Sequence, residues 1–436
     1  MAFVHCNSEE CTKSELDLFQ IAPTQTSLEK SLYIEVPPLS ALSDLAPLEF
    51  FIPGNGEDYL DLNDTLLHIT CKIVRADGTA IPNDTRVTLA NYPIATMFSQ
   101  LDVTLGDTLV SQSNNCYPYR ALIELLLNYS GETLATRFST GAFFKDTARH
   151  HESTVLDGPN QGFAKRAALT NGSRKVELLG HLHTDLFFQP RLMINGVDLK
   201  IKLTRAKDAF CLLTNDAAAG FKVQILTASL FVKRVKVAPG IRLAHAEAMR
   251  TTTAKYPVDR VSMKVFSIAA GTRVSNVDNL FLGQLPKQLV LALVDNDSFS
   301  GEYTKNPFNF KHYNVNFVAL YVDGEQTPLK PLQPDYEVGT HAREYMSLLQ
   351  SAGKHLEDRP FLTNCEEFGR GYALYGFNLT PDQECGDHYS LIKTGNLRAE
   401  IRFAFPLPDT VNLVVYAAFD SVIEINQNRN VLFDHA

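Results

Sequence analysis

The stretch Leu282–Asp335, LGQLPKQLVLALVDNDSFSGEYTKNPFNFKHYNVNFVALYVDGEQTPLKPLQPD, predicts the fold class of this chain. It contains two runs rich in Val, Leu, Phe and Tyr, Gln288–Val294 and Val315–Val322, which are typical of strands. The second run alternates, and its second face turns apolar toward the end, as in a strand that enters a core between two sheets. Asp323–Gly324 then predicts a hairpin turn. A regular helix or a central strand after that turn is excluded by three prolines, Pro328, Pro331 and Pro334. No pair of residues here is arranged for bond chemistry, so we interpret the stretch as scaffold.

Length and composition indicate an ordinary folded protein with two large domains. A chain of 436 residues is long for one core, and 45% hydrophobic with 20% charged residues excludes a disordered chain. The formal charge of −9 argues against a surface that coats nucleic acid, which needs clustered Lys and Arg. The densest basic patch, Lys233-Arg234-Val235-Lys236, alternates within a β pattern, and we interpret it as the solvated face of a strand.

The sequence also predicts the compartment of the protein. The N-terminus lacks the basic start and apolar run of a secretory signal, and no apolar run approaches the ~20 residues of a membrane helix. The seven cysteines are odd in number and scattered, which favours a reducing cytosol or nucleus over a disulfide framework. They are Cys6, Cys11, Cys71, Cys116, Cys211, Cys365 and Cys385.

Residues 1–30 are predicted to form an N-terminal arm that is mobile or ordered only by a neighbouring chain, because they are polar and lack a sustained period. His5, Cys6 and Cys11 are possible metal ligands by type. Their spacing matches no structural zinc pattern, and no second pair lies nearby. We therefore expect an uncoordinated tail.

Residues 31–238 are predicted to form a first β-domain. One convincing helix interrupts its strands, with Tyr119, Leu122, Ile123 and Leu126 at helical spacing and Asn114 or Asn115 near its start. Gly131–Arg174 is predicted to be irregular. The predicted strands are Leu48–Ile52, Leu66–Val74, Gln100–Leu105, Val176–Leu182, Asp185–Phe188, Val197–Leu203 and Val223–Val237.

Residues 239–436 repeat that order, after a short possible helix at Arg242–Met249. Ala342, Tyr345, Met346 and Leu349 again mark one helix, and an irregular stretch with Cys365 and Cys385 follows it. The further predicted strands are Val261–Ala269, Leu289–Val294, Leu397–Phe405 and Val411–Ile425. The shared order of strands, helix, long loop and strands indicates a duplication. The prediction is an all-β fold of two tandem jelly-roll β-sandwiches, a double jelly roll with a short helix insertion in each half.

Several residues invite a catalytic or metal interpretation, but none completes a site. His150-His151-Glu152 lies in the predicted irregular stretch, where we expect a surface loop, because adjacent residues of a strand point apart. His181 and His183 share one strand face without a His-rich partner strand, and Asp387-His388 is expected to be a polar turn. No Gly-x-Ser-x-Gly elbow occurs. We therefore predict no enzyme and no catalytic, cofactor-binding or metal site.

Long segments of the chain resemble the major capsid proteins (hexons) of Polinton/Maverick elements and adintoviruses. These segments are LPKQLVLALVDNDSFSGEYTKNPFNFKHYNV with LYVDGEQTP, FFQPRLMINGVDLKIKLTRAKDAFCL, and NLRAEIRFAFPLPDTVNLVVYAAFDSVIEINQNRNV, and the likeness runs from about Ser31 to the C-terminus. The resemblance implies a double jelly-roll major capsid protein. It implies homotrimeric, pseudo-hexagonal capsomers that contact neighbouring capsomers in an icosahedral shell around double-stranded DNA. A single jelly-roll penton protein would fill the vertices, and the compact chain implies no large surface towers.

The resemblance also implies a location and leaves alternatives open. The protein would be synthesised in the host cytoplasm, assemble in the nucleus and end in the virion capsid. A binding module remains possible, such as a carbohydrate-binding sandwich or a domesticated, capsid-derived protein that makes no shell. Tyr372, Tyr375 and Phe377 could serve a ligand, although strand aromatics are usually core. Length and duplication argue against a single jelly-roll minor capsid protein. Self-assembly distinguishes the two classes, because a capsid protein forms large closed particles and a binding module does not.

Overall fold

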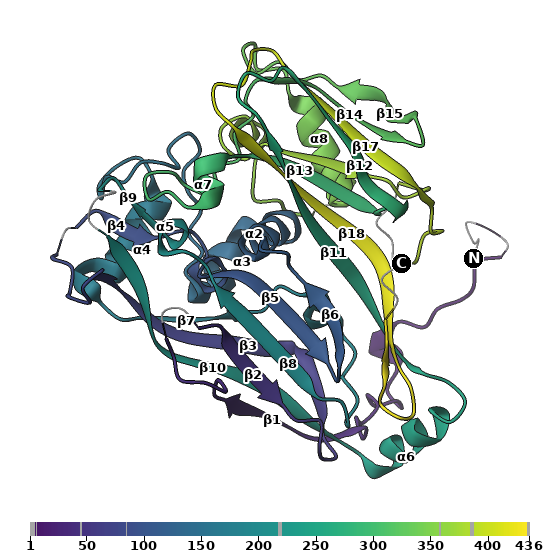
Figure 1. Ribbon diagram of the computed structural model, residues 1–436. Helices are drawn as coiled ribbons and strands as arrows, with labels where there is room; N and C mark the ends of the chain where they lie inside the picture. Colours follow the sequence, from purple (N-terminus) through teal and green to yellow (C-terminus); the bar gives the residue numbers. More distant parts are fainter. Residues whose placement is uncertain are drawn as a thin grey trace.

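A computed structural model describes residues 5, 7–43, 46–83, 85–216, 220–356, 359–383 and 388–433. Strands form most of its regular structure, and they build two sandwiches that lie side by side (Figure 1). We call the sandwich with strands between residues 28 and 237 roll 1, and the one with strands between residues 254 and 425 roll 2. No helix among the described residues is long and apolar enough to span a membrane.

Roll 1 consists of two four-stranded antiparallel sheets, with the orders β1-β10-β3-β7 and β2-β8-β5-β6. A short ladder of β4 and β9 lies apart from these sheets. The strands are β1 (Leu28–Val36), β2 (Leu48–Ile52), β3 (Tyr59–Arg75), β4 (Val87–Leu89), β5 (Phe98–Leu105), β6 (Thr108–Gln112), β7 (Val176–His181), β8 (Leu199–Arg205), β9 (Leu212–Thr214) and β10 (Phe221–Val237).

Roll 2 repeats this design with the orders β11-β18-β13-β16 and β12-β17-β14-β15, and a two-residue strand, β19, pairs with β18. The strands are β11 (Ala254–Ile268), β12 (Val274–Gln284), β13 (Gln288–Asp295), β14 (Val315–Val322), β15 (Glu325–Leu332), β16 (Leu374–Asn378), β17 (Thr394–Phe403), β18 (Val411–Ile425) and β19 (Val431–Leu432).

The two rolls share one topology. When the eight sandwich strands of each roll are numbered in chain order, the sheets read 1-8-3-6 and 2-7-4-5 in both rolls. This is the eight-stranded double-sheet arrangement of a jelly roll, so the predicted double jelly roll is confirmed. In both rolls the predicted helix lies between the fifth and sixth strands. The division of the chain at residues 238 and 239 into two domains stays a prediction.

The helices are short and lie in the connections between strands. They are α1 (Pro93–Thr96), α2 (Tyr117–Asn128), α3 (Gly131–Thr136), α4 (Gln161–Thr170), α5 (Asp208–Cys211), α6 (Pro239–Ala248), α7 (Asn296–Ser300), α8 (Ala342–Ser351) and α9 (Cys365–Phe368). Among the described residues, four 3-10 turns accompany them, namely η1 (Ser14–Leu16), η2 (Arg137–Gly141), η3 (Asn171–Ser173) and η4 (Asp185–Phe188).

The hairpin in the opening stretch forms as predicted. Asp323 and Gly324 connect β14 to β15 with φ angles of 51° and 90°, the left-handed pair that a two-residue hairpin requires. β15 carries Pro328 and Pro331 and lies at the edge of its sheet, where a residue without an N–H is tolerated.

Three predictions about local structure are wrong. Gly131–Arg174 is irregular only from residue 142 to residue 160, because α3 and α4 form on either side, and Asn160 caps α4 by accepting a hydrogen bond from the backbone of Phe163. Asp185–Phe188 is the 3-10 turn η4 and not a strand. β1 begins at Leu28, inside the predicted arm, because Leu28 pairs with Val237 of β10.

Both predicted helices form, as α2 and α8, but the start of α2 and the buried face of α8 differ from expectation. Asn114 and Asn115 adopt left-handed conformations before α2, and Cys116 occupies its N-cap position without a side-chain hydrogen bond. In α8 the buried face consists of Glu344, Leu348 and Ser351, not of the predicted apolar residues. Among those predicted residues, Ala342 and Met346 are exposed and Tyr345 and Leu349 are half-buried.

Candidate functional site

The junction between the rolls holds a buried network of charged side chains, and it is our candidate site. α2 lies between the two rolls (Figure 1). Its residues from Tyr117 to Leu127 are all buried, although the helix includes Arg120 and Glu124. A surface helix keeps charged residues on its solvent side, so a helix buried all round must satisfy its charges internally.

Arg120 is the centre of this polar network, and its side chain is 1% exposed. Its guanidinium donates to Glu124 Oε1 at 2.9 Å, one helical turn away, and to Asp185 Oδ1 at 2.5 Å. Asp185 Oδ1 also accepts a hydrogen bond from the backbone N–H of Val261 in β11 at 3.1 Å. The network therefore crosses from roll 1 into roll 2.

His183 and Tyr92 extend the network within roll 1. Glu124 Oε2 lies 2.8 Å from His183 Nδ1, and Tyr92 Oη lies 3.2 Å from His183 Nε2. Burial alone would raise the pKa of Glu124, but the Arg120 charge and His183 outweigh it and hold that pKa below its ordinary value. Burial of Asp185 outweighs the attraction of Arg120 and raises the pKa of that carboxyl. The two carboxyls bind the same guanidinium, but the pKa of Glu124 is lowered and the pKa of Asp185 is raised.

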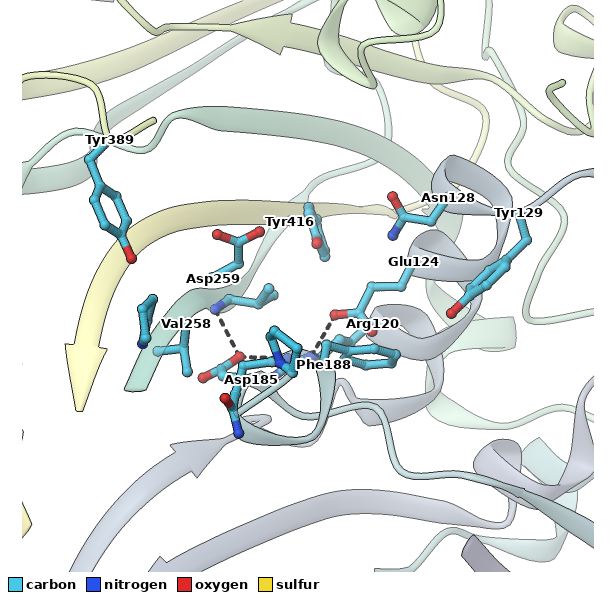
Figure 2. Close-up of a pocket in the computed structure, with 14 residues that line it drawn as sticks. Arg120, Glu124, Asn128, Tyr129, Asp185, Phe188, Val258, Asp259, Tyr389 and Tyr416 are labelled. Carbon is cyan, nitrogen blue, oxygen red and sulfur yellow. Dashed lines mark hydrogen bonds and ion pairs between the residues drawn. The ribbon is translucent and has the colours of Figure 1, made fainter. Parts of the chain in front are cut away.

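A cleft of about 400 Å³ opens beside this network. Figure 2 shows Arg120 bonded to both Glu124 and Asp185 on one side of it, with Asp259, Tyr389 and Tyr416 of roll 2 around the other side. The charged side chains of α2 that line the cleft already bind one another. Their chemistry is therefore that of a structural joint between the rolls.

A second contact joins the connection 142–160 of roll 1 to roll 2. Asp146 is 2% exposed and accepts hydrogen bonds from Arg166 at 2.7 Å, Asn160 at 3.0 Å and, across the junction, Asn306 at 3.0 Å. The hydroxyl of Tyr372 donates to the Asp146 carbonyl at 2.6 Å. Every partner of this buried carboxylate is a fixed donor, which rigidifies the joint.

Aromatic packing forms a third contact. Tyr119 of α2 stacks on Phe299 at 5.4 Å between ring centroids and meets Phe308 and Phe310 edge-on or tilted. Phe210 of roll 1 packs against Tyr119 and Phe308. Because each such ring pair contributes about 0.5–1.5 kcal/mol beyond its buried area, this cluster adds apolar adhesion to the polar contacts.

The predicted histidine candidates are placed differently from expectation. His150 and Glu152 are exposed in a turn, as expected of a surface loop, but the His151 side chain between them is 2% exposed, so the expectation fails for that residue alone. Its ring lies 4.9 Å from that of Tyr372, and neither ring nitrogen has a hydrogen-bond partner. Burial lowers the pKa of His151 to about 4. His181 contacts Arg137, so it and His183 have separate partners and do not converge on one site.

The remaining candidates that the structure describes form no metal cluster. Within the described ranges, no group of three His, Cys, Asp or Glu is arranged to hold a metal ion. The five described cysteines are free thiols, and burial raises the pKa of Cys71, Cys116 and Cys211 to about 12. Cys6, Cys385 and Asp387 lie outside the described residues.

Side-chain contacts test the predictions about the basic patch and about the candidate ligand-binding aromatic residues. Lys233 of the basic patch binds Asp61 at 3.2 Å and Asp64 at 2.9 Å, and Lys236 binds Glu29 at 2.9 Å, so acidic partners neutralise both. The aromatic side chains that could have served a ligand are buried, with exposures of 5% or less, and they are Tyr372, Tyr375 and Phe377.

Sequence reasoning missed the charged residues of the junction. The signal was present, because Arg120 and Glu124 stand at i and i+4 inside the otherwise apolar run YPYRALIELLL. When the other residues of a helix are apolar on every side, a charged pair on that helix indicates that the pair is buried and bound to other polar groups. Asp185 and Asp146 gave no such signal, since their partners are distant in the sequence.

Comparisons with known proteins place this fold. No family model matches the chain. A curated relative, the uncharacterized protein F54H12.2 of Caenorhabditis elegans, is 25% identical over 425 residues, which cover 94% of this chain and 99% of the relative.

Solved structures of viral proteins share the fold along the whole chain. A chain from the cryo-EM structure of the Sputnik virophage superposes with a TM-score of 0.65 at 14% identity, covering 100% of this chain and 95% of that one. A chain of the PBCV-1 virus capsid gives 0.61 at 10% identity, with coverage of 96% and 99%. The mavirus major capsid protein gives 0.55 at 12% identity, with coverage of 100% and 97%. The chain is therefore similar in fold to double jelly-roll viral major capsid proteins.

Proposed function

We propose that this chain is a structural, non-enzymatic major capsid protein. The proposal rests on one observation: the two rolls have the same strand topology and are held together rigidly. The buried Arg120–Asp185–Val261 network and Asp146 join them. Two equal units held rigidly side by side allow three chains to present six similar units. The likeness in fold to the mavirus major capsid protein supports the same role.

The proposed assembly is a homotrimeric, pseudo-hexagonal capsomer. Such capsomers would tile an icosahedral shell around double-stranded DNA, with a single jelly-roll penton protein at the vertices. Contacts within the trimer would bury on the order of thousands of Å² per chain, as in other obligate interfaces. The resemblance to Polinton/Maverick and adintovirus proteins supports this lineage, in which synthesis in the cytoplasm precedes assembly in the nucleus.

The proposed role leaves genome packaging mainly to other proteins. The chain has a formal charge of −9, and acidic partners neutralise the Lys233 and Lys236 side chains. Neutralising DNA phosphates requires clustered, unpaired cations.

A second candidate is a capsid-derived, domesticated binding or interaction protein that forms no shell. The relative of nearly equal length in a nematode favours it, since the fold would then be present in an animal protein. Self-association distinguishes the candidates. Light scattering of the purified full chain should give three times 48.5 kDa if the capsid proposal holds. A stable monomer at high concentration would favour the domesticated protein.

A further inference from the structure

We propose that the chain binds a small phosphate ester that carries a flat ring, in a second cavity at the junction of the two rolls. This cavity has a volume of about 430 Å³, which lies within the range of small-molecule sites. None of the described residues that line it also lines the cleft beside Arg120. The inference goes beyond the proposed capsid role and does not depend on it, because the described walls all belong to a single chain.

Short connections of both rolls enclose the cavity. Arg205 ends β8, Phe210 belongs to α5 and Tyr119 to the first turn of α2, whereas Phe299 belongs to α7 of roll 2. Figure 1 shows these three helices close together where the rolls meet. A molecule bound here would therefore contact both rolls.

The hydroxyl of Tyr119 is a buried donor that the fold does not use. Tyr119 lines the cavity and is only 1% exposed, and its hydroxyl has no hydrogen-bond partner among the described residues. Burial raises the pKa of this hydroxyl well above its ordinary value, so the group stays protonated and is able to donate. A buried polar group without a partner requires an explanation, and a ligand that accepts its hydrogen bond supplies one.

The guanidinium of Arg205 holds further unused donors. Its Nη2 donates to the Val223 carbonyl at 3.0 Å, but its Nε and Nη1 are buried without a hydrogen-bond partner in the described part of the chain. The planar fork of an arginine matches the oxygens of a phosphate or a carboxylate. Arg205 and Tyr119 therefore line one cavity with three donors that lack an acceptor.

The charge of the cavity favours an anion. Lys207 lies at its exposed edge and donates to a neutral group, the Ser300 carbonyl, at 3.3 Å. None of the described residues that line the cavity is acidic. α2 begins here, and its N-cap residue Cys116 forms no side-chain cap hydrogen bond, so the positive end of the helix dipole adds to the two cations.

Aromatic side chains select the other part of the ligand. Tyr119 and Phe299 stack with 5.4 Å between ring centroids and 15° between ring planes, and Phe210 meets Tyr119 edge-on. Rigid rings of this kind pack well against another flat ring. The cavity thus combines donors for an anion with an aromatic wall, which together fit a phosphate joined to a flat ring, as in a nucleotide.

The first test is calorimetric titration of the full chain with adenosine monophosphate and with phenyl phosphate. We expect at least one of them to bind. Adenosine, which lacks the phosphate, should bind at least about tenfold more weakly than adenosine monophosphate, because the hydrogen bonds to the charged group are lost. Tighter binding of adenosine monophosphate would identify a nucleotide site, and equal or tighter binding of phenyl phosphate would identify a site for smaller aryl phosphates. Inorganic phosphate that binds as tightly as both would overturn the inferred ring.

The second test removes the unused donors. Tyr119→Phe deletes only a hydroxyl without a partner, so the unfolding temperature of the free protein should not fall, whereas the affinity for the bound phosphate should fall about tenfold. Arg205→Gln should weaken binding by at least as much. Tyr313→Phe is the matched control, because it also deletes a buried hydroxyl without a partner among the described residues, but Tyr313 does not line this cavity.

Two results would overturn the inference. One is that neither phosphate binds to the unmodified chain, and the other is that Tyr119→Phe and Arg205→Gln bind the ligand as tightly as Tyr313→Phe. Circular dichroism identifies a variant that fails to fold. Because Arg205→Gln also loses a bond to the Val223 carbonyl, Lys207→Gln at the exposed edge replaces it if it fails to fold. Light scattering reports assembly separately, so a failure of the capsid proposal is distinguishable from a failure of this inference.

Discussion

The Asp185 carboxylate of roll 1 accepts the backbone N–H of Val261 of roll 2 at 3.1 Å, and the same oxygen binds Arg120. One buried oxygen thus ties the helix of the first sandwich to the first strand of the second. Because a backbone donor cannot be moved without moving its strand, this bond fixes the orientation of the rolls, not only their proximity.

The first prediction concerns this network. Arg120→Met should lower the free energy of unfolding by about 3–5 kcal/mol, because Glu124 and Asp185 would remain buried without their cation. The measurement is denaturant unfolding followed by circular dichroism. Arg250→Met is the control, since the Arg250–Glu247 pair is about 70% exposed and its loss should change little. Equal, small effects of both substitutions would show that the junction does not depend on Arg120.

A second prediction follows from two open glycines. An added Cβ would meet no atom within 4 Å at Gly324 or at Gly240, but only Gly324 has a positive φ, at 90°. Gly324→Ala should therefore destabilise the protein by about 1 kcal/mol through backbone strain. Gly240→Ala, in the first turn of α6, should stabilise it by up to about 1 kcal/mol. Thermal unfolding of both variants checks the prediction, and shifts of the same sign would contradict it.

The third prediction is a pH dependence from His151. Its pKa is about 4 in the folded protein against 6.5 for the free side chain, because burial disfavours the charged ring. The unfolded chain therefore binds a proton first as the pH falls, and stability is lost between pH 6.5 and about 4, by about 3 kcal/mol for this group.

Replacement of His151 tests this dependence. His151→Leu should flatten the loss of stability over that range, and it should cost little at pH 7, because neither ring nitrogen has a partner. His150→Gln, at the exposed neighbouring position, should keep the original slope. An unchanged slope in His151→Leu would show that other groups cause the acid sensitivity.

The fourth prediction concerns the N-terminal arm. Leu16, Leu18, Phe19 and Ile21 are 67–96% exposed, and β1 begins only at Leu28. We expect this apolar segment to bind a neighbouring chain. Deletion of residues 1–24 should leave the fold intact and raise the protein concentration needed for assembly by about tenfold.

Point variants of the arm distinguish the effect of its apolar side chains on assembly from the effect of its length. Phe19→Asp with Ile21→Asp should reproduce most of the effect of the deletion, whereas Gln20→Asp should not. Sedimentation velocity measures assembly in each case. Assembly that is unchanged after the deletion would exclude a role for the arm.

The sequence allowed the architecture to be predicted because periodicity is a local signal. Val411–Ile425 forms β18 with the predicted bounds. A long apolar run with β-branched residues is stable as a strand that is buried on both faces. Asp185–Phe188 failed for the opposite reason. Its four residues were too few to show a period, and Asp185 is held by Arg120 and Val261, which are remote in sequence.

Other parts of the candidate site were not predictable because tertiary partners decide them. The buried state of His151 depends on Tyr372, which lies in the other roll. In α8, Met346 is 46% exposed although its spacing indicated a core position. An apolar helical stripe predicts that the face is covered, but it does not say whether the cover comes from the same chain.

Electron microscopy of the purified full chain shows directly whether it forms capsomers. We expect particles with a hexagonal outline, each built from three chains, and closed shells at higher concentration. Particles of the size of a single 48.5 kDa chain, with no larger assemblies at any concentration, would contradict it.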